Sequence, residues 1–176
     1  MYFPMRSEQD KVRNYLLTQG QKYSFEELWF RIVKARVQLI EELDGIDEEQ
    51  AGFTPNQSEW TIAEVVQHVV LSTERVAFII EALVNGEEPD TSGIDPPKMP
   101  AASGITTLKR HVLSGAIRWS AMTQRLPPNP DYKFMARHSF FGDLHAGAWY
   151  LFQRVHDLDH VNQIVSLKRH LHYPGK

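Results

Sequence analysis

Two histidines lie four residues apart in the segment VHDLDHVNQI, residues 155–164. On an α-helix, residues at i and i+4 lie one turn apart on the same face, so the imidazoles of His156 and His160 can converge on one point. Converging neutral imidazoles make a good site for a divalent metal ion. The same spacing is compatible with an acid–base pair, with core packing or with a solvent-facing position, so the spacing alone does not decide.

A catalytic metal site usually has three protein ligands and an open position for water or substrate. The best third candidate is His68, which lies at the edge of the apolar face of another predicted helix. Metal sites in helical bundles are built from facing helices. We therefore predict a divalent metal ion on His68, His156 and His160. Side chains expected to hold an imidazole N–H or to line the pocket are Glu64, His145, Trp149, Asp157, Asp159 and Gln163.

Other patterns compete with this interpretation. The segment also reads as His-Asp-x-x-His, close to the His-Glu-x-x-His of zinc metalloproteases. We disfavour a protease because Asp157 is shorter than Glu as a general base and no third ligand follows at a familiar spacing. His138 lies in a predicted connection and His145 near a helix start. Either could line a pocket, and we expect both at the boundary of the core.

The composition is that of a globular protein, with 42% apolar and 23% charged residues in a chain of 176. This length fits one domain over residues 1–176, with a helical core at about 24–170. The chain has no cysteine, which excludes disulfides, a protein thiolate nucleophile and cysteine-ligated metal sites. Any thiol chemistry would need a thiol supplied by a cosubstrate.

Charge and hydropathy narrow the possible partners. The net charge is −3, and no segment gathers the Lys and Arg side chains that would neutralise a row of phosphates. No apolar run reaches the roughly 18 residues of a membrane span. The segment MYFPMRSEQDKV lacks the apolar core of a signal peptide. We expect a cytoplasmic protein that binds a small molecule rather than nucleic acid or a membrane.

The hydrophobic periodicity predicts four long amphipathic helices and one short one. Ser24 with Glu27, and Thr61 with Glu64, have the spacing of capping boxes that begin two of the long helices. A connection rich in Pro, Gly and Ser covers residues 87–104, and two shorter connections precede the last helix. The predicted helices cover residues 9–18, 24–45, 61–86, 105–126 and about 143–170.

This pattern predicts an all-α protein, an antiparallel four-helix bundle. Strand signals are few, and the sequence has neither a Gly-rich phosphate-binding loop nor an alternating strand–helix pattern. The long connection at 87–104 would allow a crossover between two parallel helices.

Two segments resemble the DinB-like (DinB/YfiT-like) superfamily. They are EWTIAEVVQHVVLSTERV (residues 59–76) and HSFFGDLHAGAWYLFQRVHDLDHVNQI (residues 138–164). Members of that superfamily carry Trp-Ser/Thr-Ile-x-Glu followed by a histidine, then a His-Pro-x-x-Gly turn, and His-x-x-x-His with Gln-Ile on the final helix. The resemblance covers about residues 24–170. This sequence departs from the pattern at Ser139, where proline is usual, and at His145, where a small or apolar residue is common.

The resemblance implies an up-down-down-up bundle, often a homodimer, with nickel, zinc or iron bound to His68, His156 and His160. Characterised relatives include bacillithiol S-transferases and a mycothiol-dependent maleylpyruvate isomerase. The expected function is therefore a metal-dependent transfer of a low-molecular-weight thiol, in stress or detoxification metabolism. The alternatives are a hydrolase that uses metal-activated water, with Asp157 or Glu64 as base, and a non-catalytic metal-binding or interaction bundle.

Overall fold

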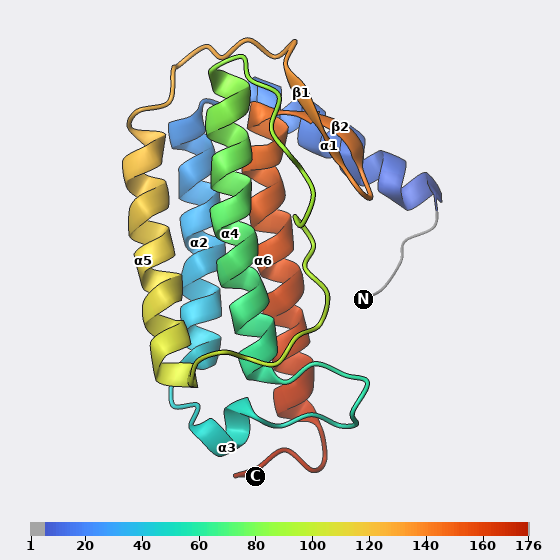
Figure 1. Cartoon of the computed structure of the whole chain (residues 1–176), viewed down its shortest axis with the longest axis vertical. Helices are drawn as coiled ribbons and strands as arrows, with labels where there is room; N and C mark the ends of the chain where they lie inside the picture. The colour runs from blue at the N-terminus through green and yellow to red at the C-terminus, as the bar shows by residue number, and fades with distance from the viewer. Residues whose placement is uncertain (1–5, 176) are drawn as a thin grey trace.

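Four long helices lie side by side in the computed structural model, which describes residues 6–175 (Figure 1). Helix α2 runs down the bundle as drawn, α4 and α5 both run up it, and α6 returns down. This up-down-down-up order confirms the predicted all-α bundle. No helix among the described residues is both long and apolar enough to cross a bilayer. The four helices are α2 (Phe25–Leu43), α4 (Ile62–Val84), α5 (Ile105–Thr123) and α6 (Ala146–Arg169).

Both predicted capping boxes are present. The Ser24 hydroxyl accepts a hydrogen bond from the Glu27 backbone N–H, and the Glu27 side chain accepts one from the Ser24 backbone. Thr61 and Glu64 make the same exchange at the start of α4. These bonds satisfy N–H groups that the first helical turn leaves without a partner. A third box, at Asp47, begins the one-turn helix α3 (Glu48–Ala51), which the hydrophobic periodicity does not predict.

A layer of buried polar side chains divides the core into two apolar clusters. One cluster includes Leu28, Ile79 and Trp149, and the other includes Leu39, Val65 and Ile164. Along α2, α4 and α6, the polar layer lies between the positions that supply these two clusters. It consists of Arg36, Ser72, Thr73, Gln153 and Asp157, each at most 3% exposed.

The segment before α6 is a β-hairpin rather than the predicted connection. Strand β1 (Met135–His138) pairs antiparallel with β2 (Gly142–His145), and Met135 lies opposite His145. Gly142 adopts a φ of 68°, which glycine tolerates at a turn. Because residues 142–145 pair with β1, α6 begins at Ala146 and not near Asp143 as predicted.

Helix α1 (Arg6–Lys22) lies beside the hairpin, outside the four-helix bundle (Figure 1). It is longer than the predicted helix at 9–18 and continues through Gly20. At this position α1 crosses the first turn of α6 backbone against backbone, with Gly20 against Gly147. The His145 ring adds a contact, because its Nε2 lies 3.1 Å from the Leu17 carbonyl oxygen.

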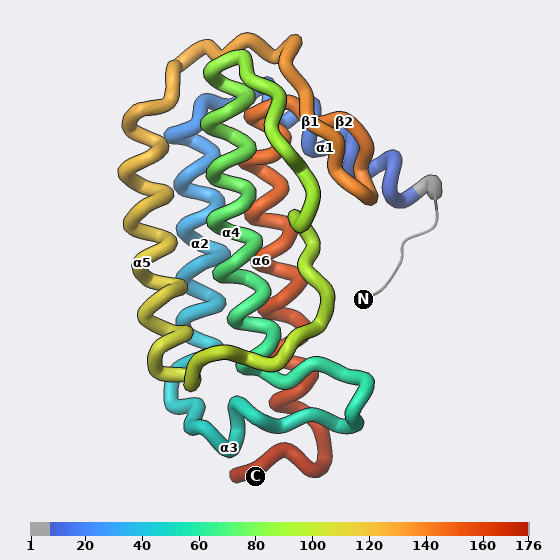
Figure 2. The backbone as a smooth tube through the Cα atoms, in the orientation of Figure 1, coloured from blue at the N-terminus to red at the C-terminus, as the bar shows by residue number. Residues whose placement is uncertain are grey.

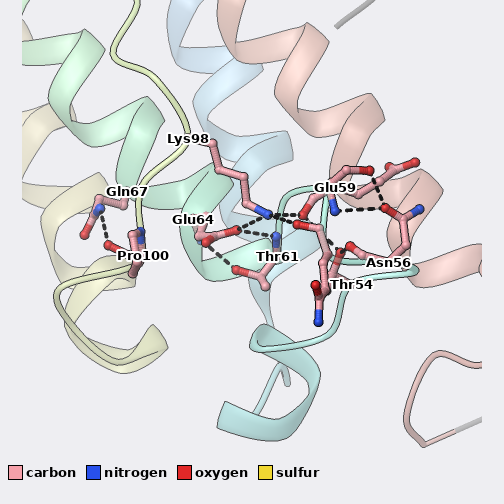
Figure 3. A network of polar contacts seen from close by, with 10 residues as sticks. Thr54, Asn56, Glu59, Thr61, Glu64, Gln67, Lys98 and Pro100 are labelled. Atoms are coloured by element: carbon pink, nitrogen blue, oxygen red, sulfur yellow. Dashed lines mark hydrogen bonds and ion pairs between the residues drawn. The ribbon is translucent and has the colours of Figure 1, made fainter.

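The connection between the parallel helices α4 and α5 runs along the outside of α4 for nearly its full length (Figure 2). Side chains hold it at both ends. Arg75 donates to Asp90 and to the Ser92 carbonyl, each at 2.9 Å. At the other end, Gln67 bonds the backbone of Pro100 and Ala102, and Lys98 reaches the carbonyls of residues 57 and 59 (Figure 3). The segment between these anchors is thereby held against α4.

Replacing Gly147 by alanine should destabilise the fold, because the added methyl would overlap the Gly20 carbonyl. We expect a loss of about 1–3 kcal/mol in the free energy of unfolding, the usual cost of forcing extra volume into a packed site. Gly115 on α5 is the control, since a methyl there meets only Thr73 Cγ2 at 3.7 Å. Gly115→Ala should instead stabilise the protein slightly through helix propensity. Urea unfolding of both variants tests this, and equal effects would contradict the close crossing.

Candidate metal centre

The structure brings together the three histidines that the sequence singles out. His68 comes from α4, and His156 and His160 come from successive turns of α6. The Nε2 atom of His156 lies 3.1 Å from Nε2 of His68 and 3.2 Å from Nε2 of His160. Nitrogen ligands about 2.0–2.1 Å from a tetrahedral zinc ion lie about 3.3 Å apart. The candidate ligand atoms of the three histidines all lie within 4.8 Å of one another, so the three side chains can converge on a single divalent cation.

The His160 ring is oriented by a neighbour one turn along α6. Its Nδ1 lies 2.9 Å from Oε1 of Gln163, and an amide oxygen only accepts, so Nδ1 carries the proton. The lone pair is thereby left on Nε2, which points toward the other two histidines. Metal-ligating histidines are commonly held in this way. Gln163, one of the candidates named from sequence, thus contacts a predicted ligand directly.

Burial keeps the rings of His68 and His156 neutral. Burial and the neighbouring charge of His160 lower the pKa of His68 to about 4, against a hydrogen bond to the Pro96 backbone that raises it. Burial also places the pKa of His156 well below its usual value, and charges on His160 and His68 lower it further. Neutral imidazole is the form that binds metal ions. The edge of the Trp60 ring packs on His68, with ring centroids 5.3 Å apart.

A pocket of about 230 Å³ opens beside His156 and His160. Its wall is mostly apolar and comes from α1, the long connection, the hairpin and α6. Asp95, Asp159 and His138 add polar groups, and neither lysine nor arginine of the described chain lines it. The apolar lining consists of Val12, Ile94, Phe140, Phe141, Phe152 and Val155.

Two carboxylates named as candidates are engaged elsewhere. The Glu64 carboxylate accepts from the Thr61 backbone at 2.8 Å and lies 3.7 Å from Lys98 Nζ (Figure 3). Asp157 is fully buried and pairs with Arg36 Nε at 2.8 Å, while Gln153 donates to its other oxygen. Neither has a hydrogen bond to a site histidine among the described contacts. As Asp157 follows His156 directly, it lies about 100° away around the helix and faces α2.

The other candidates divide between cap, core and pocket. His145 is the N-cap of α6, where its Nδ1 accepts from the Ala148 backbone N–H at 3.2 Å. Trp149 is fully buried and donates to the Ala136 carbonyl. Neither lines the pocket beside the histidines. Asp159 does line that pocket, from an exposed position on α6.

Two further residues lie at the pocket: Asp95, which no sequence pattern indicated, and His138, for which a pocket position was the less favoured alternative. Asp95, on the long connection, lies with Oδ1 3.9 Å from His68 Nε2. His138, expected at the core boundary, is only 4% exposed and lines the pocket. Burial alternates along β1, so that Ala136 and His138 point inward while Met135 and Arg137 are exposed. No local pattern marks Asp95, because an irregular connection has no period.

Removing the Gln163 amide should weaken metal binding while leaving the fold intact. In Gln163→Leu the His160 ring loses the acceptor that fixes its tautomer, and such losses typically cost about 10- to 100-fold in metal affinity. The neighbouring Asn162 is exposed and serves as the matched control through Asn162→Ala. Competition with a chromogenic zinc chelator measures both affinities. Equal affinities in the two variants would mean that Gln163 does not orient a ligand.

Comparisons with known proteins agree with this architecture. The chain is similar to the four-helix bundle protein TT2238, whose crystal structure matches with a TM-score of 0.58 at 17% identity, over 81% of this chain and 99% of that one. This likeness concerns the fold alone. A search of curated proteins gives no match. The family model of the DinB superfamily matches residues 31–164, which span α2 to α6 and include all three histidines. The chain therefore belongs to the DinB superfamily.

Proposed function

We propose that this protein is a metal-dependent enzyme that transfers a low-molecular-weight thiol to an electrophile. The observation that supports it best is the convergence of three imidazole side chains beside an apolar pocket. His68, His156 and His160 would hold one divalent cation, such as nickel, zinc or iron. Imidazole ligands suit all three metals. Membership of the DinB superfamily is consistent with this site.

A cation bound there would supply positive charge that lowers the pKa of a coordinating thiol. The chain has no cysteine, so the thiol would come from a cosubstrate. When the thiol adds across an electrophilic double bond, the S–H bond and the π bond break, an S–C bond forms, and the proton ends on the adjacent carbon. No oxidant or reductant is needed for this step. The apolar pocket wall would bind the electrophile and exclude water that competes with the thiol.

Asp95 is the carboxylate best placed to receive the thiol proton. Its Oδ1 lies 3.9 Å from Nε2 of His68, and the side chain lines the pocket. Both Glu64 and Asp157 are occupied by other contacts, as described above. A hydrolase that activates water is the alternative, and it would have to use Asp95 as well, since the two bases expected for it are engaged elsewhere.

We also propose a cytoplasmic homodimer. The outer faces of the adjacent helices α2 and α5 carry large exposed apolar side chains, among them Phe30 at 76% and Ile117 at 71% exposure. Val37 and Leu113 lie on the same faces at helical spacing. Burial of such side chains between two copies would be favourable. Low-molecular-weight thiols are held reduced in the cytoplasm, which suits a thiol-dependent reaction.

The first experiment is metal analysis of untagged protein purified without chelator. We expect about one divalent metal ion per chain, lost in His68→Ala and in His156→Ala because two imidazoles bind far more weakly than three. His111→Ala is the matched control, since His111 is an exposed histidine on α5. Inductively coupled plasma mass spectrometry gives the stoichiometry. Unchanged metal content in His68→Ala would exclude the three-histidine site.

Activity assays then separate the two reaction classes. The metal-loaded protein is offered a thiol with a panel of electrophiles, and in parallel a panel of esters, amides and lactones. Thiol consumption that requires the metal would support transfer, whereas hydrolysis without thiol would support the hydrolase. Metal bound without either activity would favour a binding or interaction role.

Replacing Asp95 by asparagine should lower turnover without loss of metal. The variant keeps the size of the side chain and removes the proton acceptor, and such a change typically costs about 10²- to 10⁴-fold in rate. Asp159→Asn is the control, because Asp159 lines the same pocket from an exposed position. If Asp95→Asn instead loses its metal, Asp95 is a ligand and not a proton acceptor. Full activity of Asp95→Asn would exclude both roles.

A further inference from the structure

His138 places a polar ring in the otherwise aromatic part of the pocket. It lies at the end of β1, on the buried face of the hairpin. Its ring centroid lies 4.5 Å from that of Phe152, 4.9 Å from that of Phe141 and 5.2 Å from that of Trp149. Phe152 in turn contacts His156, with ring centroids 5.6 Å apart. His138, His156 and His160 therefore line one pocket, and the Phe152 ring contacts both His138 and His156.

The hydrogen bonding of His138 fixes its tautomer. The backbone N–H of Phe140 donates to Nδ1 at 3.0 Å, so Nδ1 is an acceptor and carries no proton. Burial lowers the pKa of His138 to about 4, which keeps the ring neutral near neutral pH. The single ring proton is then on Nε2. Among the side chains that the structure describes, from residue 8 to residue 175, no hydrogen bond from this Nε2–H is found. Nε2 is not one of the fully buried unpaired atoms, so it is accessible from the pocket that His138 lines.

An N–H that faces a pocket and has no protein acceptor is free to donate a hydrogen bond to a ligand bound there. The pocket also limits what that ligand can be. Its described lining contains two carboxylates, Asp95 and Asp159, and no lysine or arginine. An uncharged oxygen acceptor therefore suits this end of the pocket better than an anion does. The aromatic wall favours an apolar or aromatic body attached to that oxygen.

We propose that His138 is a substrate-positioning residue whose Nε2–H donates a hydrogen bond to an uncharged carbonyl oxygen of an apolar substrate. This role of His138 rests on the proposed function only in that the pocket is taken as the substrate site. It names the substrate class, a small carbonyl compound with an apolar or aromatic body. Phe141 and Phe152 would pack on that body, between His138 and the metal ligands.

The test compares two probes that differ in one oxygen. Acetophenone and ethylbenzene share a phenyl ring and a two-carbon chain, and only acetophenone has a carbonyl acceptor. We expect the wild-type protein to prefer acetophenone by about 3- to 10-fold, the usual worth of one neutral hydrogen bond. Dissociation constants are measured by NMR titration on chelator-treated protein and again after zinc loading. The metal-free measurement is the decisive one, because a bound cation could also bind the carbonyl oxygen and so favour acetophenone without His138.

Two variants assign the preference to His138. His138→Phe keeps an aromatic ring and removes the donor, so acetophenone and ethylbenzene should bind about equally. His138→Gln offers an amide N–H in place of the imidazole and should restore part of the preference. Ethylbenzene binding by each variant shows that the pocket is still formed, which separates a lost hydrogen bond from a lost fold. Nitrogen-15 spectra of the His138 ring report directly whether the proton is on Nε2.

Several results would overturn the proposal. They are equal binding of the two probes by metal-free wild-type protein, an unchanged preference in His138→Phe, and a proton on Nδ1. Benzoate that binds more tightly than acetophenone to the metal-free protein would exclude the uncharged class of ligand. Absence of a bound metal would contradict the proposed function, but the comparison of acetophenone with ethylbenzene would still test the role of His138. A bound metal together with equal binding of the two probes would leave the proposed function standing and contradict the role of His138.

Discussion

The buried ion pair between Arg36 and Asp157 sets the rotation of α6 within the bundle. Arg36 Nε and Asp157 Oδ2 lie 2.8 Å apart, and both side chains are at most 4% exposed. An unpaired charge at such depth costs about 3–5 kcal/mol, so rotations of α6 that separate the two groups are excluded. With Asp157 turned toward α2, the preceding His156 faces α4, and His160, one turn on, faces the same way. The three-histidine site on α4 and α6 thus depends on a contact between α2 and α6.

Contacts at the N-terminal end of α6 fix the position of this helix along the bundle axis. Gly147 lies directly against Gly20, so α1 and the first turn of α6 meet without intervening side chains. The N-cap His145 also reaches the Leu17 carbonyl, which joins hairpin, helix start and α1 at one place. α1 lies outside the part of the chain that matches the family model, yet Val12 forms part of the pocket wall. Helix α1 therefore shapes the pocket, while the three histidines come from the bundle.

The sequence predicts what depends on local pattern and fails where a tertiary contact decides. Capping boxes and helical periodicity locate α2, α4 and α5, and the i, i+4 spacing with an inward stripe identifies the three histidines. The hairpin was missed because its strands have four residues each and contain charged side chains. Asp157 was expected beside the metal because it adjoins His156, but adjacent helical residues point about 100° apart. Asp95 reaches the site only because side chains of α4 hold its connection in place.

The core ion pair also affects the charge that the three histidines can hold. Three Nε2 atoms that face one point repel one another through their lone pairs unless positive charge lies between them. A proton can bridge only two nitrogens, and burial lowers the pKa values of His68 and His156, so protonation of these two rings is unfavourable near neutral pH. A divalent cation can bind all three. The positive charge of Arg36 opposes charge at His156, since it lowers the pKa of that ring. By neutralising Arg36, Asp157 favours a cation at the three histidines without contacting any of them, and so the same ion pair both orients the ligands and balances the charge beside them.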